Sequence, residues 1–84
     1  MEKRWGEKAW DDYVEWNEKN KKTFNRINAL IKDIERNGPM NGIGKPERLK
    51  YGLGYSRRID DTNRLVYEID EHGYLYIKLC KGHY

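Results

Sequence analysis

Between residues 20 and 38 the chain carries an apolar side chain at every third or fourth position. This spacing places the side chains on one face of an α-helix, and the set comprises Phe24, Ile27, Leu30, Ile31 and Ile34. Asn20 is a suitable N-cap. The helix should end at Asn37-Gly38-Pro39, because glycine accepts a left-handed conformation and proline cannot continue a helix. The stripe is so complete that we expect this helix to pack in the core rather than to read DNA.

A first helix is predicted upstream, after a short opening segment at Glu2–Trp5. Residues Glu7–Lys19 place their large apolar side chains mostly on one side of a helix, and these are Trp10, Tyr13, Val14 and Trp16. Because only Asn20 separates the two helical segments, we expect them to form a helical hairpin.

The second half of the chain predicts a β-sheet. Residues 40–53 show no period and indicate a loop that is unusually long for a small domain. Three strands should follow, at about Gly54–Ile59, Arg64–Ile69 and Tyr74–Cys80. Turns at residues 60–63 and 70–73, the second of which contains His72, imply an antiparallel meander. We therefore predict an α+β fold in which a two-helix hairpin packs on a small, mainly antiparallel β-sheet.

Alternation along these strands assigns their side chains to two faces of the sheet. The face toward the helices should carry Ile59, Leu65, Tyr67, Ile69, Leu75, Ile77 and Leu79. The other face should be cationic and aromatic, with Arg58, Arg64, Tyr74, Tyr76 and Lys78. Arg57 has the parity of the core, so it must either extend to an edge of the sheet or follow a bulge that shifts the register.

Length and composition limit the class of protein. With 84 residues, the chain is expected to form one domain over residues 1–84. Lys and Arg outnumber Asp and Glu by 17 to 14, and basic residues are concentrated between Lys45 and Arg64, which permits a polyanionic partner. The lone Cys80 lies in an apolar strand pattern, so we expect a buried thiol in a reducing compartment. No segment resembles a membrane span or a signal peptide, which predicts a cytoplasmic protein without a membrane partner.

Residues of the basic region and of the C-terminus have the chemistry that RNA cleavage requires. The reaction needs a base for the 2′-OH proton, cations for the phosphoryl oxygens, and an acid for the leaving 5′ oxygen. Glu47 can be the base, and the planar forks of Arg58 and Arg64 can bind the phosphate. His83 can be the acid because its free pKa lies near neutrality, and Tyr84 adds a stacking face. This set requires no metal ion and no cofactor.

Other kinds of site fit the sequence less well. One Cys and two His without close spacing argue against a structural zinc site. The segment Gly42-Ile43-Gly44-Lys45 lacks the longer frame of a P-loop and is more simply a flexible turn. The residues alone therefore indicate no more than a small basic α+β domain for which RNA is one candidate partner.

Short motifs are spread over nearly the whole chain. They are Trp10-Asp11-Asp12-Tyr13 with Trp16, Ile27-Asn28, Leu30-Ile31-Lys32-Asp33, Gly44-Lys45-Pro46-Glu47 with Leu49-Lys50, Ser56-Arg57-Arg58-Ile59, Arg64-Leu65-Val66-Tyr67 and the terminal His83-Tyr84. Together these motifs resemble the YoeB branch of the RelE-type toxins of bacterial toxin–antitoxin pairs. Residues 37–43 and 51–55 depart from the family pattern, which would alter ribosome contacts or substrate preference rather than the chemistry.

The resemblance implies a RelE-like, microbial RNase-type fold and a ribosome-dependent endoribonuclease. Such a toxin, an mRNA interferase, enters the A site of the 70S ribosome and cleaves the mRNA there. A YefM-like antitoxin is the implied inhibitor, and a homodimer is a further expectation. The acidic first helix would either face away from RNA or contact a second copy. The resemblance implies catalytic roles for Glu47 as general base, Arg64 as stabiliser of the phosphoryl charge, His83 as general acid and Tyr84 as the residue that orients the nucleotide or stacks on it. It implies substrate binding by Lys45, Lys50 and Arg58.

Two other hypotheses compete with an mRNA-cleaving toxin. A non-catalytic module that binds the ribosome or RNA would block translation by occupancy and would create no new mRNA ends. A DNA-associated regulator is the third, but no recognition helix is evident, so any contact with DNA should be indirect and pass through the antitoxin.

Overall fold

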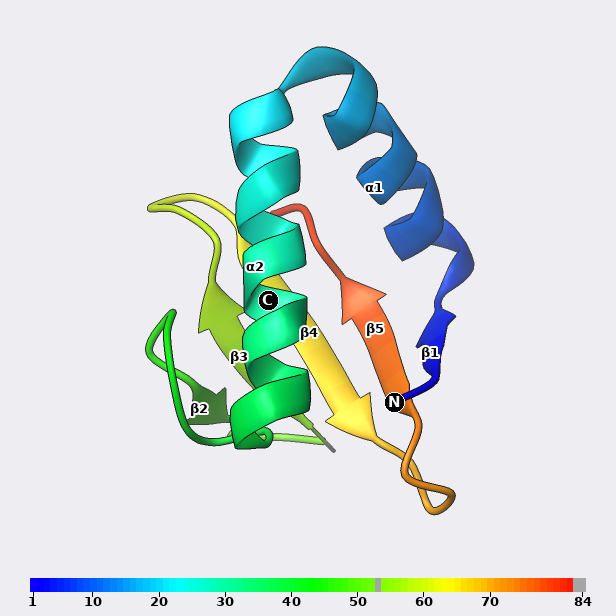
Figure 1. Ribbon diagram of the computed structural model, residues 1–84, viewed down its shortest axis with the longest axis vertical. Helices are drawn as coiled ribbons and strands as arrows, with labels where there is room; N and C mark the ends of the chain where they lie inside the picture. The colour runs from blue at the N-terminus through cyan, green and yellow to red at the C-terminus, as the bar shows by residue number, and fades with distance from the viewer. Residues whose placement is uncertain (53, 83–84) are drawn as a thin grey trace.

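The computed structural model describes residues 1–52 and 54–82, and it places two helices against one face of a β-sheet (Figure 1). The elements are β1 (Lys3–Trp5), α1 (Glu7–Lys19), α2 (Lys21–Asn37), β2 (Glu47–Arg48), β3 (Tyr55–Arg58), β4 (Arg64–Ile69) and β5 (Leu75–Leu79). The strand order among the described residues is β1-β5-β4-β3-β2, with β1 parallel to β5 and the other pairs antiparallel. The predicted α+β fold, with a helical hairpin on a mainly antiparallel sheet, is confirmed.

Helix α2 begins and ends at the residues that its capping signals predict. The Asn20 side chain accepts a hydrogen bond from the Thr23 backbone N–H at 3.2 Å. Gly38 takes φ of 87° at the other end, and its N–H donates to the Ile34 carbonyl at 2.8 Å. The aliphatic part of the stripe is buried as predicted, whereas Phe24 lies at the rim and packs on Tyr13 of α1.

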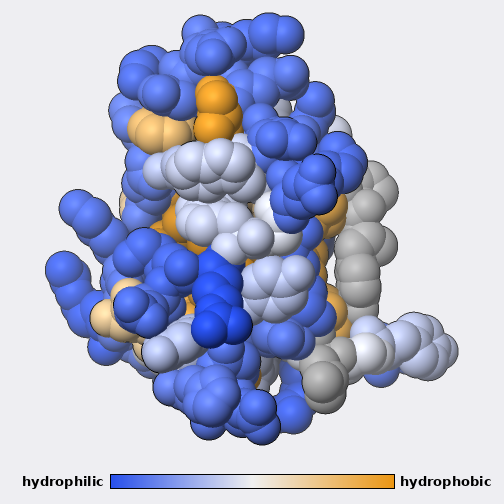
Figure 2. Space-filling model, turned by 90° about the vertical axis from the view of Figure 1, so that its right-hand side faces the viewer, coloured by the Kyte–Doolittle hydropathy of each residue, from blue (hydrophilic) through white to orange (hydrophobic). Residues whose placement is uncertain are grey.

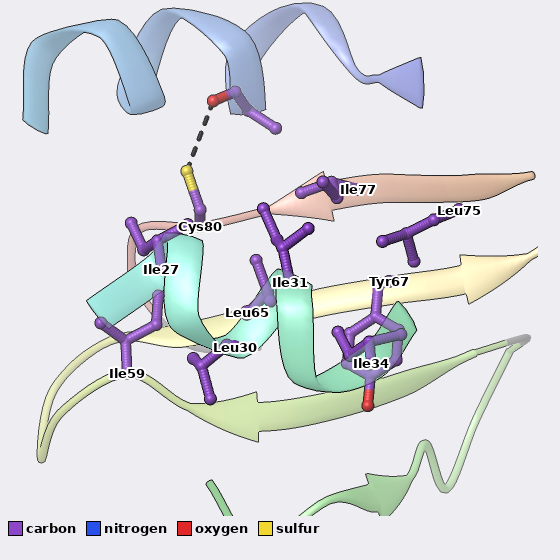
Figure 3. Close-up of a cluster of buried hydrophobic side chains, with 11 residues drawn as sticks. Ile27, Leu30, Ile31, Ile34, Ile59, Leu65, Tyr67, Leu75, Ile77 and Cys80 are labelled. Atoms are coloured by element: carbon purple, nitrogen blue, oxygen red, sulfur yellow. Dashed lines mark hydrogen bonds between the residues drawn. The ribbon is translucent and has the colours of Figure 1, made fainter. Parts of the chain in front are cut away.

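The main core lies between α2 and strands β4 and β5. Figure 3 shows the aliphatic side chains of α2 pointing toward the sheet, where they meet Leu65, Tyr67, Leu75 and Ile77. Each such side chain contributes roughly 1.5–3 kcal/mol when it is fully buried. Because the helices occupy this face of the sheet, candidate site residues on the strands belong to the opposite face, which we call the far face.

Helix α1 matches its predicted bounds, but its buried face differs from the expected one. Ala9 and Asp12 are buried, whereas Trp10 is 48% exposed and Val14 is 38% exposed. The rings of Trp10 and Tyr13 pack instead around Trp5 of β1, whose ring centroid lies 4.4 Å from that of Tyr13. Viewed from this side, the surface is mainly hydrophilic with isolated apolar positions (Figure 2). Scattered apolar residues of this kind are normal on a protein surface and indicate no site.

Two strands of the sheet were not predicted. β1 pairs with β5, and β2 pairs with β3, where Glu47 lies opposite Ser56 and Arg48 opposite Tyr55. Both strands are very short and mostly exposed, so neither carries an alternating pattern that a sequence could reveal. β2 lies within the segment that was predicted to be a loop, and it brings Glu47 into the sheet.

The predicted faces hold along the strands except at the end of β5. Val66 pairs with Leu79 and Tyr67 pairs with Ile77, so one extra residue, Lys78, is accommodated between them. This irregularity reverses the parity beyond it. The prediction that Leu79 faces the core was therefore wrong: it is half-buried outside the core cluster, and Cys80 is fully buried in its place.

The thiol of Cys80 should be unreactive in the folded protein. Its Sγ donates to the Ala9 carbonyl at 3.4 Å, and burial raises its pKa to about 12. Since the thiolate is the nucleophile, we expect a disulfide reagent at pH 8 to label the native chain at least about a hundredfold more slowly than the urea-unfolded chain. Equal labelling rates, measured by mass spectrometry, would contradict this placement.

Arg57 faces the helices and is fully buried, so neither of the two placements considered for it is correct. The register of β3 on β4 is regular at this point, with Arg57 opposite Leu65. The guanidinium donates to the Asp33 carboxylate, to the Tyr67 hydroxyl at 2.8 Å and to backbone carbonyls of the loop after α2. These carbonyls belong to Gly38, Asn41 and Ile43, at 2.8–2.9 Å. Because every N–H of the fork has a partner, the charge can be buried.

Acid should weaken the contact between Arg57 and Asp33. The hydrogen bond from Arg57 holds the pKa of Asp33 below its ordinary value of 3.8. A carboxylate whose pKa is lowered by folding stabilises the native state above its unfolded pKa, and this stabilisation is lost as the pH falls through the native pKa. We expect the free energy of unfolding to fall from pH 6 to pH 3, and to fall less steeply in Asp33→Asn. Urea titrations at several pH values would check this, and equal slopes in the two proteins would contradict it.

Among the described residues, neither helix is both long and apolar enough to cross a membrane.

Candidate active site

The pairing of β2, β3 and β4 brings predicted site residues together on the far face. Glu47 lies opposite Ser56, and Arg58 lies opposite Arg64. Directly opposed residues project to the same side of a sheet, and so do residues two apart along a strand. Glu47, Ser56, Arg58 and Arg64 therefore share the far face, as the parity of the two arginines predicted.

A pocket of about 230 Å³ lies where these strands meet. Its lining residues are Glu47, Arg48, Leu49, Lys50, Ser56 and Arg64. A neighbouring hollow of about 200 Å³ is lined by Arg58, Asp60, Asp61, Thr62 and Arg64. Arg64 lines both hollows. It therefore lies between Glu47 and Lys50 in the first hollow and Arg58 in the second. This arrangement suits a chain of phosphates that passes a general base.

Arg64 is partly buried and held from two directions. Its Nη1 contacts the Ser56 hydroxyl at 3.4 Å, and its backbone N–H donates to the Gly82 carbonyl at 2.8 Å. Ser56 is only 4% exposed, so it can limit the orientation of the guanidinium. Sequence reasoning gave Ser56 no role, because a serine in a short strand carries no signal of its own.

The loop before Glu47 is fixed to the sheet by successive residues of β3. Arg57 binds its carbonyls through the side chain, and the Arg58 backbone N–H donates to the Gly44 carbonyl at 2.7 Å. Gly44 has φ of 82°, and a Cβ there would lie 2.7 Å from Leu30, so the close approach requires glycine. These contacts hold the start of β2, and with it Glu47, at a defined distance from β4.

Lys45 is not brought into the pocket. It is exposed and is not among the described residues that line either hollow. Its φ of 50° lies in the left-handed region, which is unusual for a residue other than glycine. Strained backbone of this kind often occurs near functional sites, and here it lies directly before Pro46 and Glu47.

The predicted cationic and aromatic character of the far face is only partly observed. Glu68 pairs with Tyr76 in the register and forms an ion pair with Lys78 at 2.9 Å. A larger hollow, about 460 Å³, lies by the β4–β5 turn, and its lining sets three acids, Glu68, Asp70 and Glu71, against one basic residue, Arg48. Such an acidic lining would repel a polyanion. Positive charge therefore favours the smaller pocket between β2 and β4 as the place where a polyanion would bind.

The predicted acid and stacking residue, His83 and Tyr84, lie outside the described residues. The last described residue, Gly82, is next to the candidate site. Its carbonyl accepts from the Arg64 N–H, and its own N–H donates to the Asn63 side chain at 2.8 Å. The chain thus reaches residue 82 beside Arg64.

Comparison with known proteins identifies the family. Residues 5–84 match the family described as the YoeB-like toxin of bacterial type II toxin-antitoxin systems. Toxin YoeB of Escherichia coli (strain K12) is 46% identical over 82 residues, which cover 95% of each chain. A YoeB–YefM complex from Staphylococcus aureus superposes with a TM-score of 0.91 at 44% identity, and a YoeB dimer from the same species with 0.93 at 43%. Each alignment covers 100% of this chain and 98% of the other. The chain therefore belongs to the YoeB-like toxins of bacterial type II toxin–antitoxin systems.

Proposed function

We propose that this toxin is a ribosome-dependent endoribonuclease that cleaves mRNA in the ribosomal A site and so inhibits translation. The observation that carries the proposal is the pocket in which Glu47, Lys50 and Arg64 converge. Phosphodiester cleavage needs a base and cationic groups within reach of one phosphate. This pocket offers both, and the family membership makes RNA the most consistent substrate.

In the proposed reaction, Glu47 removes the proton from a 2′-OH, and the resulting oxygen attacks the adjacent phosphorus. The O2′–P bond forms while the P–O5′ bond breaks. Arg64 stabilises the negative charge on the phosphoryl oxygens, and His83 gives a proton to the leaving 5′ oxygen. The products are a 2′,3′-cyclic phosphate and a 5′-hydroxyl end. In these reaction steps, side chains accept or donate each proton and stabilise the charge on the phosphoryl oxygens, so the proposed route uses no metal ion.

The remaining predicted residues would bind and orient the substrate. Lys50 lines the same pocket as Glu47, and Arg58 lies opposite Arg64 in the neighbouring hollow, so both are placed to hold flanking phosphates. Tyr84 would stack on or orient a nucleotide. Lys45 would contact RNA only outside the pocket, which is consistent with its exposed position.

Partners follow from the same proposal. The relatives solved as YoeB–YefM complexes support neutralisation by a YefM-like antitoxin, and the YoeB dimer from Staphylococcus aureus supports a homodimer of this chain. DNA would be contacted only through the antitoxin. A cytoplasmic location follows from the proposed substrate, because translating ribosomes are found there.

Primer extension on a defined mRNA in a reconstituted translation reaction tests this function. We expect new 5′ ends within the A-site codon, none without ribosomes, and only a residual rate over hours with His83→Gln, which removes the proposed proton donor. Addition of a YefM-like antitoxin should suppress the ends. Arrested translation with intact mRNA would contradict cleavage and would support a non-catalytic module that acts by occupancy.

A further inference from the structure

The turn between β3 and β4 is organised by one carboxylate. Asp60 Oδ1 accepts from the backbone N–H of Thr62 at 2.8 Å and from that of Asn63 at 2.7 Å. Partial burial works to raise the pKa of Asp60, but the hydrogen bonds from Asn63 and Thr62 outweigh it and hold this pKa below its ordinary value. The carboxylate is therefore an acceptor at neutral pH, and it fixes the backbone of the turn.

The same carboxylate fixes the side chain of Asn63. Asn63 Nδ2 donates to both oxygens of Asp60, each at 3.1 Å. This leaves the amide oxygen of Asn63 facing the opposite way, where it accepts from the Gly82 N–H at 2.8 Å. The reversed amide would set donor against donor at Gly82 and acceptor against acceptor at Asp60, so only one orientation satisfies both contacts.

Gly82 is thereby held by two neighbouring residues of one turn. Asn63 accepts from its N–H, and the backbone N–H of Arg64 donates to its carbonyl at 2.8 Å. Gly82 has φ of 79°, a conformation that a side chain would disfavour. Arg64 is the candidate phosphate ligand of the pocket, so this turn connects the phosphate site directly to the C-terminal segment.

Helix α1 holds the residues just before Gly82. The Trp16 indole N–H donates to the Cys80 carbonyl at 2.9 Å, and Lys81 forms an ion pair with Glu15 at 3.2 Å. These contacts bring the segment to the edge of β4 but do not reach Gly82. Asn63 supplies the last side-chain contact on the described part of the chain before the proposed proton donor, His83.

We propose that Asn63, oriented by Asp60, is a positioning residue for the reaction, because it fixes the backbone of Gly82, the residue before the proposed proton donor, beside Arg64. The inference rests on the proposed function, since it assigns the donor to His83. This role requires no contact between Asn63 and the substrate. It matters because a general acid must lie within hydrogen-bond reach of the leaving oxygen, and a displacement of about 1 Å can slow a reaction by about a hundredfold.

The first test measures single-turnover cleavage by wild type and Asn63→Ala over a series of ribosome concentrations. We expect Asn63→Ala to lower the maximal rate by about tenfold to a hundredfold while the half-saturating ribosome concentration stays within about twofold. In the His83→Gln background, where the residual rate is followed over hours, the same substitution should cause less than about a twofold further loss. When two substitutions act through the same catalytic group, their effects on the rate do not add.

A reciprocal exchange keeps the test independent of folding. Asn63→Asp sets a second carboxylate against Asp60, and it should lose activity as Asn63→Ala does. Asp60→Asn combined with Asn63→Asp restores a donor facing an acceptor, and it keeps an oxygen toward Gly82. The double variant should therefore recover at least about half of the wild-type rate.

The β4–β5 turn provides the matched control. Asp70 accepts from the N–H groups of His72 and Tyr74 at 2.8 and 2.9 Å, so it organises its turn as Asp60 does, but away from the proposed pocket. Asp70→Ala should lower the melting temperature comparably and leave the maximal rate unchanged. An equal loss of rate in Asp70→Ala would show that stability alone matters and would overturn the inference.

The outcomes separate this inference from the proposed function. If wild type cleaves in a His83-dependent manner but Asn63→Ala cleaves at the wild-type rate, positioning by Asn63 is refuted and the function stands. If wild type leaves mRNA intact on ribosomes, both are refuted. Three results would together establish that Asn63 is a positioning residue. Asn63→Ala must lower the rate, the exchanged pair must recover it, and Asn63→Ala must add no further loss to His83→Gln.

Discussion

Replacement of Glu47 by Gln is expected to slow mRNA cleavage by about 10²- to 10⁴-fold, the usual contribution of a positioned general base. Glutamine has nearly the same shape as glutamate, so the β2–β3 pairing of Glu47 with Ser56 should persist. The amide of glutamine, however, cannot accept the 2′-OH proton as a carboxylate does. The rate is measured in single-turnover reactions on ribosomes programmed with one mRNA.

A matched control uses another exposed acid. Glu18 lies near the end of α1 and carries the same functional group outside the pocket. Glu18→Gln makes the same change in net charge, so it should cleave within about twofold of wild type and bind ribosomes equally well. A Glu47→Gln protein that also cleaves within about twofold of wild type would remove Glu47 from the mechanism.

Arg57→Met should cause a large loss of stability, about 3–5 kcal/mol in the free energy of unfolding. Methionine fills much of the space but donates no hydrogen bond. The substitution removes the hydrogen bonds that the guanidinium donates to the Asp33 carboxylate, the Tyr67 hydroxyl and the loop carbonyls. A buried polar group that is left without a hydrogen-bond partner destabilises the folded state by its full desolvation penalty.

Urea denaturation followed by tryptophan fluorescence would measure this effect. Arg36→Met is the control, because Arg36 is exposed near the end of α2 and should change the free energy by less than about 1 kcal/mol. Arg57→Lys should lie between the two, since an ammonium group cannot reach all the partners of a planar fork. If Arg57→Met unfolds within about 1 kcal/mol of wild type, the buried network does not hold the loop.

The elements that sequence predicted well are those with a regular period. The apolar stripe of α2 repeats at helical spacing, and β4 was predicted with its observed bounds, Arg64–Ile69. β1 and β2 were missed because backbone pairing with a neighbour, rather than side-chain alternation, defines them. The error at Leu79 has a similar cause, because the irregularity opposite Val66 and Tyr67 reverses the parity and leaves no mark in the sequence.

The candidate site, too, was predicted from the sequence only in part. Parity predicted Arg58 and Arg64 on the far face, but only the pairing of β2 brings Glu47 to them. Arg57 was recognisable as an anomaly, a charge at a core position. Its partners could not be found, because they come from residues 10 to 24 positions away in the chain. Asp60 and Asn63 had a visible signal as a turn, yet the contact of Asn63 with Gly82 depends on the tertiary fold.

In the proposed reaction, side chains of this pocket drive attack by the 2′-OH on the adjacent phosphate. The most direct measurement places one 2′-deoxynucleotide at the attacking position of an A-site codon and compares its cleavage with that of the all-RNA message. We expect the deoxy substitution to abolish cleavage there, while the all-RNA message yields a 2′,3′-cyclic phosphate end by mass spectrometry. Continued cleavage beside the deoxynucleotide would contradict the mechanism.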